Sequence, residues 1–170
     1  MSRRWRWIAI ILLLLVASVL AAPQPRIPVA GASPADWNQQ TFWHYPWGTS
    51  GVHKGIDIFA RKGTPVLAPV SGLVVYSGVW PQGGEVVLLL GPGWQVHYLA
   101  HLERRTVGNG QWLTAGASLG TVGDSGNARG KPPHLHYSIV DLLPRPWRID
   151  GERQGWKKMF YRNPSLELQR

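Results

Sequence analysis

Two histidines separated by a single residue occur in the segment 132–140, which reads PPHLHYSIV. The alternation that follows them is typical of a β-strand. Residues i and i+2 of a strand point to the same face, so His134 and His136 are expected to face one point. The two prolines cannot pair inside a sheet, and they indicate that the strand begins as it leaves a loop. Two imidazoles fixed on one face suit a metal site, in which one or both could be ligands.

A second group of ligand types lies about 80 residues earlier, in the sequence H-x-x-x-D formed by His53 and Asp57. In an extended chain these two side chains share a face, and Gly55 between them leaves that face uncrowded. A catalytic zinc site uses three protein ligands and keeps a fourth position for water. His53, Asp57 and one histidine of the pair at 134 and 136 would complete such a set. Calcium would require more oxygen ligands, so the donor types favour zinc.

His97 and His101 form another pair, with matching parity on an expected strand at 94–102. One of them could accept a proton near a metal-bound water. No glutamate stands beside a candidate ligand as it does in H-E-x-x-H enzymes, so an imidazole is the available base. For His44 and His97 alone, an ordinary structural role is the preferred interpretation.

The elements that must position these side chains are short strands separated by turns rich in glycine and proline. The chain has 20 glycines and 14 prolines in 170 residues, and no segment from 51 to 140 has a helical period over three turns. We therefore predict an all-β domain, an antiparallel β-sandwich or partly closed barrel of short hairpin-linked strands. The expected strands cover 55–60, 66–68, 72–77, 85–90, 94–102 and 116–122, followed by the strand that contains the His-Leu-His sequence.

The N-terminal segment 1–22 has the pattern of a secretory signal peptide, with three arginines followed by an apolar run from Ile8 to Leu20. Small residues favour cleavage after Ala21. The alternative is an uncleaved anchor in the inner membrane, because the apolar run approaches the length that spans a bilayer. Either interpretation places the remainder outside the cytoplasm, in the periplasm or cell envelope, and argues against a nucleic-acid partner.

Three further segments are expected: a linker and aromatic N-terminal segment at 23–50, the β core at 51–141, and a basic, aromatic C-terminal extension at 142–170. The extension could be a surface flap or a substrate-facing edge. The net charge of +9 falls to +6 without the three N-terminal arginines, which fits an anionic partner such as cell-wall polymer or equally an ordinary basic surface. The absence of cysteine excludes disulfides and thiolate metal sites.

Several motifs together resemble the lysostaphin/LytM-type metalloendopeptidases of bacterial cell walls. The resemblance covers about residues 51–140, with the motifs in the family's order. It implies that His53, Asp57 and His136 bind one Zn²⁺ ion, and that His101 and His134 are unligated catalytic histidines. The motifs are GVHKGIDI at 51–58, GTPVLAPVSG at 63–72, AHL at 100–102, GDSG at 123–126 and PHLH at 133–136.

The function that the resemblance implies is zinc-dependent hydrolysis of peptide cross-links in peptidoglycan. Membrane contact is expected only through the N-terminal segment, if it is not cleaved. The arginine-led N-terminus and the absence of a separate wall-binding segment favour a Gram-negative periplasm, and hence D-alanyl–diaminopimelate cross-links over glycine bridges. One alternative is a non-catalytic family member that regulates another wall hydrolase. A third interpretation, a zinc carrier without catalysis, has less support, because it leaves His101 and His134 without a role.

Overall fold

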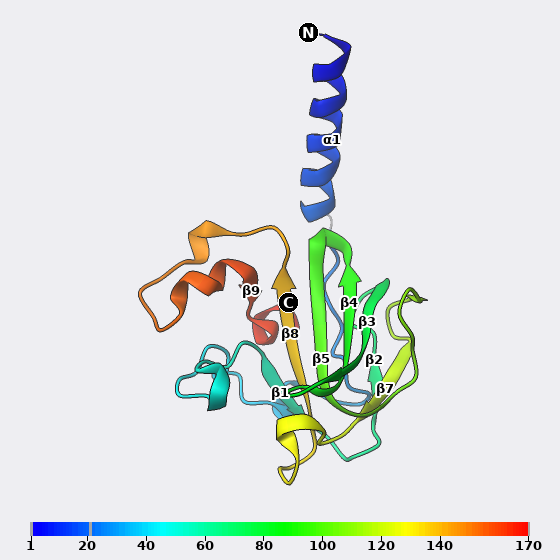
Figure 1. The fold of residues 1–170 in the computed structure, drawn as a ribbon, viewed down its shortest axis with the longest axis vertical. Helices are drawn as coiled ribbons and strands as arrows, with labels where there is room; N and C mark the ends of the chain where they lie inside the picture. Colours follow the sequence, from blue (N-terminus) through cyan, green and yellow to red (C-terminus); the bar gives the residue numbers. More distant parts are fainter. Residues whose placement is uncertain (1, 21, 170) are drawn as a thin grey trace.

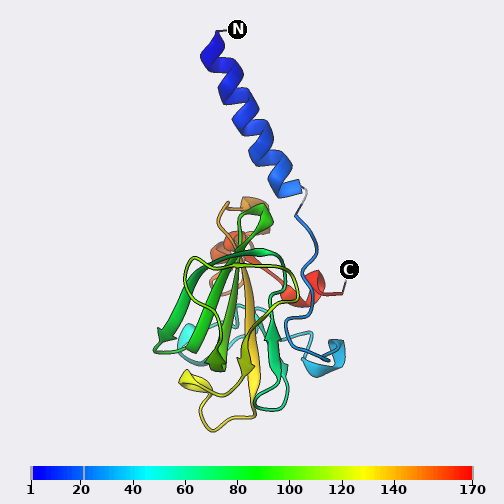
Figure 2. The same ribbon diagram turned by 90° about the vertical axis from the view of Figure 1, so that its right-hand side faces the viewer.

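The computed structural model describes residues 2–20 and 22–169 of the chain. The N-terminal helix α1, Arg3–Leu20, projects from the β domain beyond the turn between β4 and β5 (Figures 1 and 2). Within the described ranges, no helix combines the length and the apolar character needed to cross a membrane. The expected cleavage point after Ala21 lies outside the described residues.

Nine strands form one sheet in which every pairing is antiparallel, so the predicted all-β fold is confirmed. Glycines occupy turns between strands. Gly84 and Gly93 have φ of 66° and 72°, values that residues with a Cβ rarely adopt. The strands are β1 (Ile56–Phe59), β2 (Pro65–Leu67), β3 (Gly72–Trp80), β4 (Gly84–Gly91), β5 (Gln95–Arg105), β6 (Trp112–Leu113), β7 (Ser118–Val122), β8 (His134–Asp141) and β9 (Tyr161–Arg162).

The main path of the sheet runs β1-β8-β5-β4-β3-β6, and it does not close into a barrel. Figure 1 shows β8, β5 and β4 side by side at its centre. Strand β5 changes partners along its length. Its first half pairs with β8, and its last residues pair with β7, which in turn pairs with β2. The sandwich-like arrangement therefore arises from one long strand shared by two parts of a single sheet.

The core is built from the inward-facing residues of these strands, which alternate with outward-facing ones as a half-buried sheet requires. On β8 the alternation puts one set of side chains into the core and leaves the histidines on the opposite face. Fully buried members of the core are Ile56, Ile58, Val66, Ala68, Val74, Val87, Leu89, Leu99, Leu102, Leu119, Val122, Leu135, Tyr137 and Ile139.

Part of the segment expected to be a linker is attached to the sheet. Val29 is buried and forms a bridge with Val66 of β2. The Arg26 amide donates to the Pro69 carbonyl at 2.9 Å, and the Leu67 amide donates to the Pro28 carbonyl at 2.9 Å. The prolines around this stretch hide its strand-like pairing from a pattern search, because its partners lie about 40 residues away in the sequence.

The C-terminal extension packs against β8 through β9, which pairs Val140 with Tyr161. The indole of Trp37 donates to the hydroxyl of Ser165 at 3.0 Å, so the extension also holds the N-terminal aromatic segment. Besides α2 (Pro164–Glu167), the short helical turns are η1 (Pro34–Asp36), η2 (Gly48–Ser50), η3 (Pro92–Trp94), η4 (Gly126–Ala128), η5 (Pro146–Arg148) and η6 (Gly155–Phe160).

Candidate metal centre

Three candidate ligand atoms meet at one point on the outer face of the sheet. Asp57 Oδ1 lies 2.8 Å from His136 Nδ1 and 3.2 Å from His53 Nε2, and the two nitrogens are 3.1 Å apart. Nitrogen and oxygen ligands at about 2.0–2.1 Å from a tetrahedral zinc ion lie about 3.3 Å from one another. The donor types and their spacing therefore fit a single zinc ion with a fourth position left for water.

Strand pairing explains why two of these side chains meet. Asp57 on β1 lies directly opposite His136 on β8, so their side chains share a face across the ladder. Gly55 provides the space beside them, because a Cβ at that position would lie 2.5 Å from Ser138 Oγ and 3.0 Å from the ring of His136.

His53 reaches the centre by a different route from the predicted one. Strand β1 begins at Ile56, so the explanation by parity along one strand was wrong for His53. Its backbone pairs with the aromatic segment instead: the His53 amide donates to the His44 carbonyl at 3.0 Å, and the Trp43 amide donates to the His53 carbonyl at 2.6 Å. The fold therefore positions His53 through backbone pairing with the aromatic segment that precedes it, which the H-x-x-x-D spacing does not reveal.

The second nitrogen of each candidate ligand ring is also engaged. His53 Nδ1 lies 3.2 Å from the Thr41 carbonyl, and the ring stacks on Trp47 with centroids 4.0 Å apart. His136 Nε2 lies 3.1 Å from Ser138 Oγ. A carbonyl can only accept, so Nδ1 of His53 carries the proton and Nε2 presents its lone pair to the centre. A donor–acceptor pair between His136 and Ser138 likewise leaves Nδ1 of His136 for the metal.

Replacing Ser138 with alanine is expected to weaken zinc binding by about 10- to 100-fold, because the ring of His136 loses the partner that orients it. Competition with a chelator of known affinity measures this change. Ser138→Thr keeps the hydroxyl and is the matched control. Unchanged zinc affinity in Ser138→Ala would show that the hydroxyl does not position the ring.

The local charges also suit a cation. Burial by itself would raise the pKa of Asp57, but the contacts with His136 and then His53 outweigh it and hold that pKa well below its usual range. Burial lowers the pKa of His136. At neutral pH the cluster therefore presents a carboxylate and unprotonated imidazole, which are the forms that bind zinc.

His101 and His134 lie beside these three residues without being part of the ligand cluster. His101 Nδ1 lies 2.9 Å from the Ser125 carbonyl, and His134 Nδ1 lies 2.8 Å from the Pro132 carbonyl. The two rings are 5.1 Å apart, and His134 Nε2 lies 4.0 Å from Asp57 Oδ1. Because both Nδ1 atoms donate to carbonyls, the neutral form of each ring has its lone pair on Nε2, where it can accept a proton.

The predicted common face of His97 and His101 was wrong. His101 has a φ of 62°, and the pairing register of β5 with β4 shifts between Leu99 and Leu102. This β-bulge changes which face the following side chains point to. As a result His101 lies over the outer face with its ring 5.9 Å from that of His136, while His97 is buried in the core.

The two histidines outside the centre occupy different environments. His97 Nδ1 lies 2.7 Å from the Tyr137 hydroxyl, and burial, with the charge of Arg162, lowers the pKa of His97 to about 3. His44 is exposed and meets Trp47 edge-on at 6.1 Å. Neither ring is part of the three-ligand cluster.

Sequence reasoning missed several residues that surround the centre. Ser138 was detectable, because it follows His136 by two positions on the same strand face. Trp47 lies in an irregular segment and Tyr98 requires knowledge of the fold, so no local pattern identifies them. Phe59 is exposed and its ring lies 5.5 Å from that of His134, at the edge of the site.

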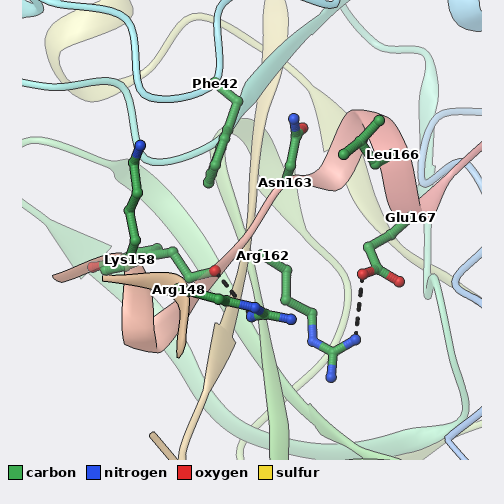
Figure 3. Close-up of a pocket in the computed structure, with 8 residues that line it drawn as sticks. Phe42, Arg148, Lys158, Arg162, Asn163, Leu166 and Glu167 are labelled. Atoms are coloured by element: carbon green, nitrogen blue, oxygen red, sulfur yellow. Dashed lines mark hydrogen bonds and ion pairs between the residues drawn. The ribbon is translucent and has the colours of Figure 1, made fainter. Parts of the chain in front are cut away.

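The basic C-terminal extension forms a separate pocket of about 350 Å³ that does not include the five site residues (Figure 3). Its cations have acidic partners: Arg162 lies 3.3 Å from Glu167, and Lys158 lies 2.7 Å from Glu152. The Arg148 guanidinium donates to buried Asp141 at 2.8 Å. The pair with Asp141 anchors the extension to β8, and the other two lie within the extension.

Comparison with known proteins identifies relatives of this β domain. The model of Peptidase family M23 matches residues 51–146. An L-Ala–D-Glu endopeptidase of Bacillus subtilis is 34% identical in an alignment of 147 residues that covers 74% of this chain and 42% of that protein. The peptidoglycan DD-endopeptidase ShyC of Vibrio cholerae is 33% identical over 97 residues, which are 57% of this chain and 22% of that protein.

Among solved structures, the catalytic domain of lysostaphin from Staphylococcus simulans matches with a TM-score of 0.59 and 28% identity. The match covers 74% of this chain and 86% of that domain. The chain thus spans less than half the length of the two curated relatives but most of a solved catalytic domain.

Proposed function

Since this chain belongs to Peptidase family M23, we propose that it is a zinc-dependent endopeptidase that hydrolyses peptide cross-links of bacterial peptidoglycan. The observation that carries the proposal is the meeting of His53, Asp57 and His136, whose ligand atoms all lie within 4.8 Å of one another. Two further histidines, His101 and His134, stand beside them without belonging to the ligand cluster. A regulator without catalysis would not require this complete arrangement.

In this proposal His53 Nε2, Asp57 Oδ1 and His136 Nδ1 hold the metal. Zinc bound there would lower the pKa of a coordinated water from about 15.7 towards about 7 and polarise the scissile carbonyl. Thr41 and Ser138 fix the two imidazole ligands in the tautomers that the metal requires.

His101 and His134 handle the protons. One Nε2 accepts the proton of the attacking water, and the ring that is thereby protonated passes this proton to the leaving amine. The other ring stabilises the developing oxyanion when its own Nε2 carries a proton. Burial, followed by the neighbouring His136 and His134, lowers the pKa of His101 to about 4, so this ring is unprotonated at neutral pH. Both rings present Nε2 to the site, so either can act as the base.

We further propose that the protein acts in the cell envelope, with residues 1–22 as its export signal or anchor and residues 142–170 as a basic extension beside the peptidase core. The curated relatives include proteins named as lipoproteins, among them YgeR of Escherichia coli. A zinc centre of this kind can hydrolyse any peptide bond that reaches it, so the metal does not determine which cross-link is cut. We propose D-alanyl–diaminopimelate cross-links as the substrate, in preference to glycine bridges.

Digestion of purified sacculi of both wall types tests this proposal. We expect zinc-loaded protein to release D-alanyl–diaminopimelate cross-linked fragments as monomers, identified by mass spectrometry, and a chelator to prevent the release. If the products come from glycine bridges alone, the proposed substrate is wrong. If no peptide bond is cleaved in either wall, the proposed activity is wrong.

A further inference from the structure

A row of three aromatic rings leads away from the candidate metal centre along the sheet. The ring of Tyr98 meets that of His136 edge-on at 5.9 Å, and Trp80 stacks on Tyr98 with centroids 5.5 Å apart. Tyr76 continues the row, with its ring 5.4 Å from Trp80. The rings connect strands β3 and β5 directly to a candidate zinc ligand.

The strand register places this row on the outer face of the sheet. Tyr76 lies opposite Leu88 of β4, Leu88 lies opposite Tyr98 of β5, and Tyr98 lies opposite Ser138 of β8. Residues directly opposite one another in a sheet share a face. Since Ser138 contacts the ring of His136, this is the same face that carries the metal centre.

The row is accessible at its middle ring. Trp80 is 39% exposed, although a large aromatic side chain gains free energy from burial. Gly78 leaves room for the neighbouring ring, because a Cβ there would lie 2.5 Å from Cζ of Tyr76. An accessible aromatic row that begins at a reaction centre is suited to binding a part of the substrate beyond the bond that is cut.

The residues around the aromatic row indicate which part of the substrate it would bind. The turn 79–84 reads VWPQGG and contains no charged residue, and Glu85 after it is paired with Arg105. Gln82, two residues after Trp80, has a polar side chain whose amide donates to Thr49 Oγ1 at 3.1 Å. A carboxylate or ammonium group of a peptide would require an opposite charge, whereas a pyranose has an apolar C–H face and polar substituents.

We propose that Tyr76, Trp80 and Tyr98 bind sugar rings of the glycan strand that carries the cross-link being cut. The inference rests on the proposed peptidoglycan endopeptidase function and adds a saccharide subsite to it. Stacking on the accessible indole holds the sugar, and the Gln82 amide hydrogen-bonds to its polar substituents. The subsite favours substrates that still carry their sugars.

The test compares two forms of one cross-linked substrate: muropeptide dimers with their disaccharides, and the same dimers after an amidase has removed the sugars. We expect Trp80→Ala to lower kcat/KM roughly 3- to 10-fold on the sugar-bearing dimers only. Trp80→Phe, which keeps a ring, should retain most of the activity. Trp112→Ala removes a 65% exposed indole outside the row and is the matched control.

An equal loss in Trp80→Ala on both substrates, or no loss on either, would overturn the proposal. Binding of peptide-free glycan oligomers, measured by calorimetry, separates this result from a failure of the proposed function. Wild type and Trp112→Ala should bind the oligomers, and Trp80→Ala should bind them several-fold more weakly. Glycan binding without any hydrolysis would refute the endopeptidase function alone, while hydrolysis without glycan binding would refute the subsite alone.

Discussion

Replacing His136 with alanine is expected to abolish both zinc binding and the hydrolysis of peptidoglycan. His136 Nδ1 lies 2.8 Å from Asp57 Oδ1 and 3.1 Å from His53 Nε2, so its removal opens one corner of the three-ligand set. Loss of a residue that only orients a ligand ring costs about 10- to 100-fold in metal affinity or activity, and loss of a ligand itself should exceed this, to about 1,000-fold or more in kcat/KM.

Metal analysis of the purified variant and release of soluble fragments from sacculi measure the two effects. His44→Ala is the matched control, because it removes an exposed histidine outside the cluster. It should keep its zinc and its activity. Continued cleavage by a metal-free His136→Ala protein would refute the role of this residue as a ligand.

The second large effect is expected from His101→Ala and His134→Ala. Each variant should retain zinc, because neither ring belongs to the ligand cluster, yet lose activity by about 10²- to 10⁴-fold. Metal content and kcat/KM measured on the same preparations separate a loss of proton transfer from a loss of metal. Added imidazole should restore part of the activity by entering the space left by the ring.

The pH dependence of wild type provides an independent readout. The pKa of His101 is lowered to about 4, mainly by burial, so the ring accepts a proton above that pH and is already protonated below it. Activity that depends on His101 as a base should therefore fall as the pH approaches 4 from above. A zinc-loaded variant of either histidine with wild-type kcat/KM would exclude that histidine from proton transfer.

The sequence predicts this site best where the backbone is regular. Strand β8 follows simple alternation, so the common face of His134 and His136 could be inferred from spacing, and Ser138 follows from the same rule. The division of roles within that pair had a different source: parity allows either ring to bind metal, and only the family resemblance assigned the metal to His136.

What spacing could not reveal depends on irregular backbone and on contacts between distant segments. The bulge at His101 rotates its ring to the outer face, although the pattern of β5 places it with His97. The stacking of Trp47 on His53 and the docking of Val29 on β2 join segments whose local sequence has no clear period. Such features are set by tertiary packing, which a local pattern does not encode.

The central claim is that one zinc ion held by His53, Asp57 and His136 makes this chain a peptidoglycan endopeptidase. Titration of zinc into chelator-treated full-length protein, with cleavage of purified sacculi followed at each addition, tests it most directly. We predict no cleavage without metal and a rise that saturates at one zinc ion per chain. Cleavage by the metal-free protein at the rate of the zinc-loaded protein would contradict the claim.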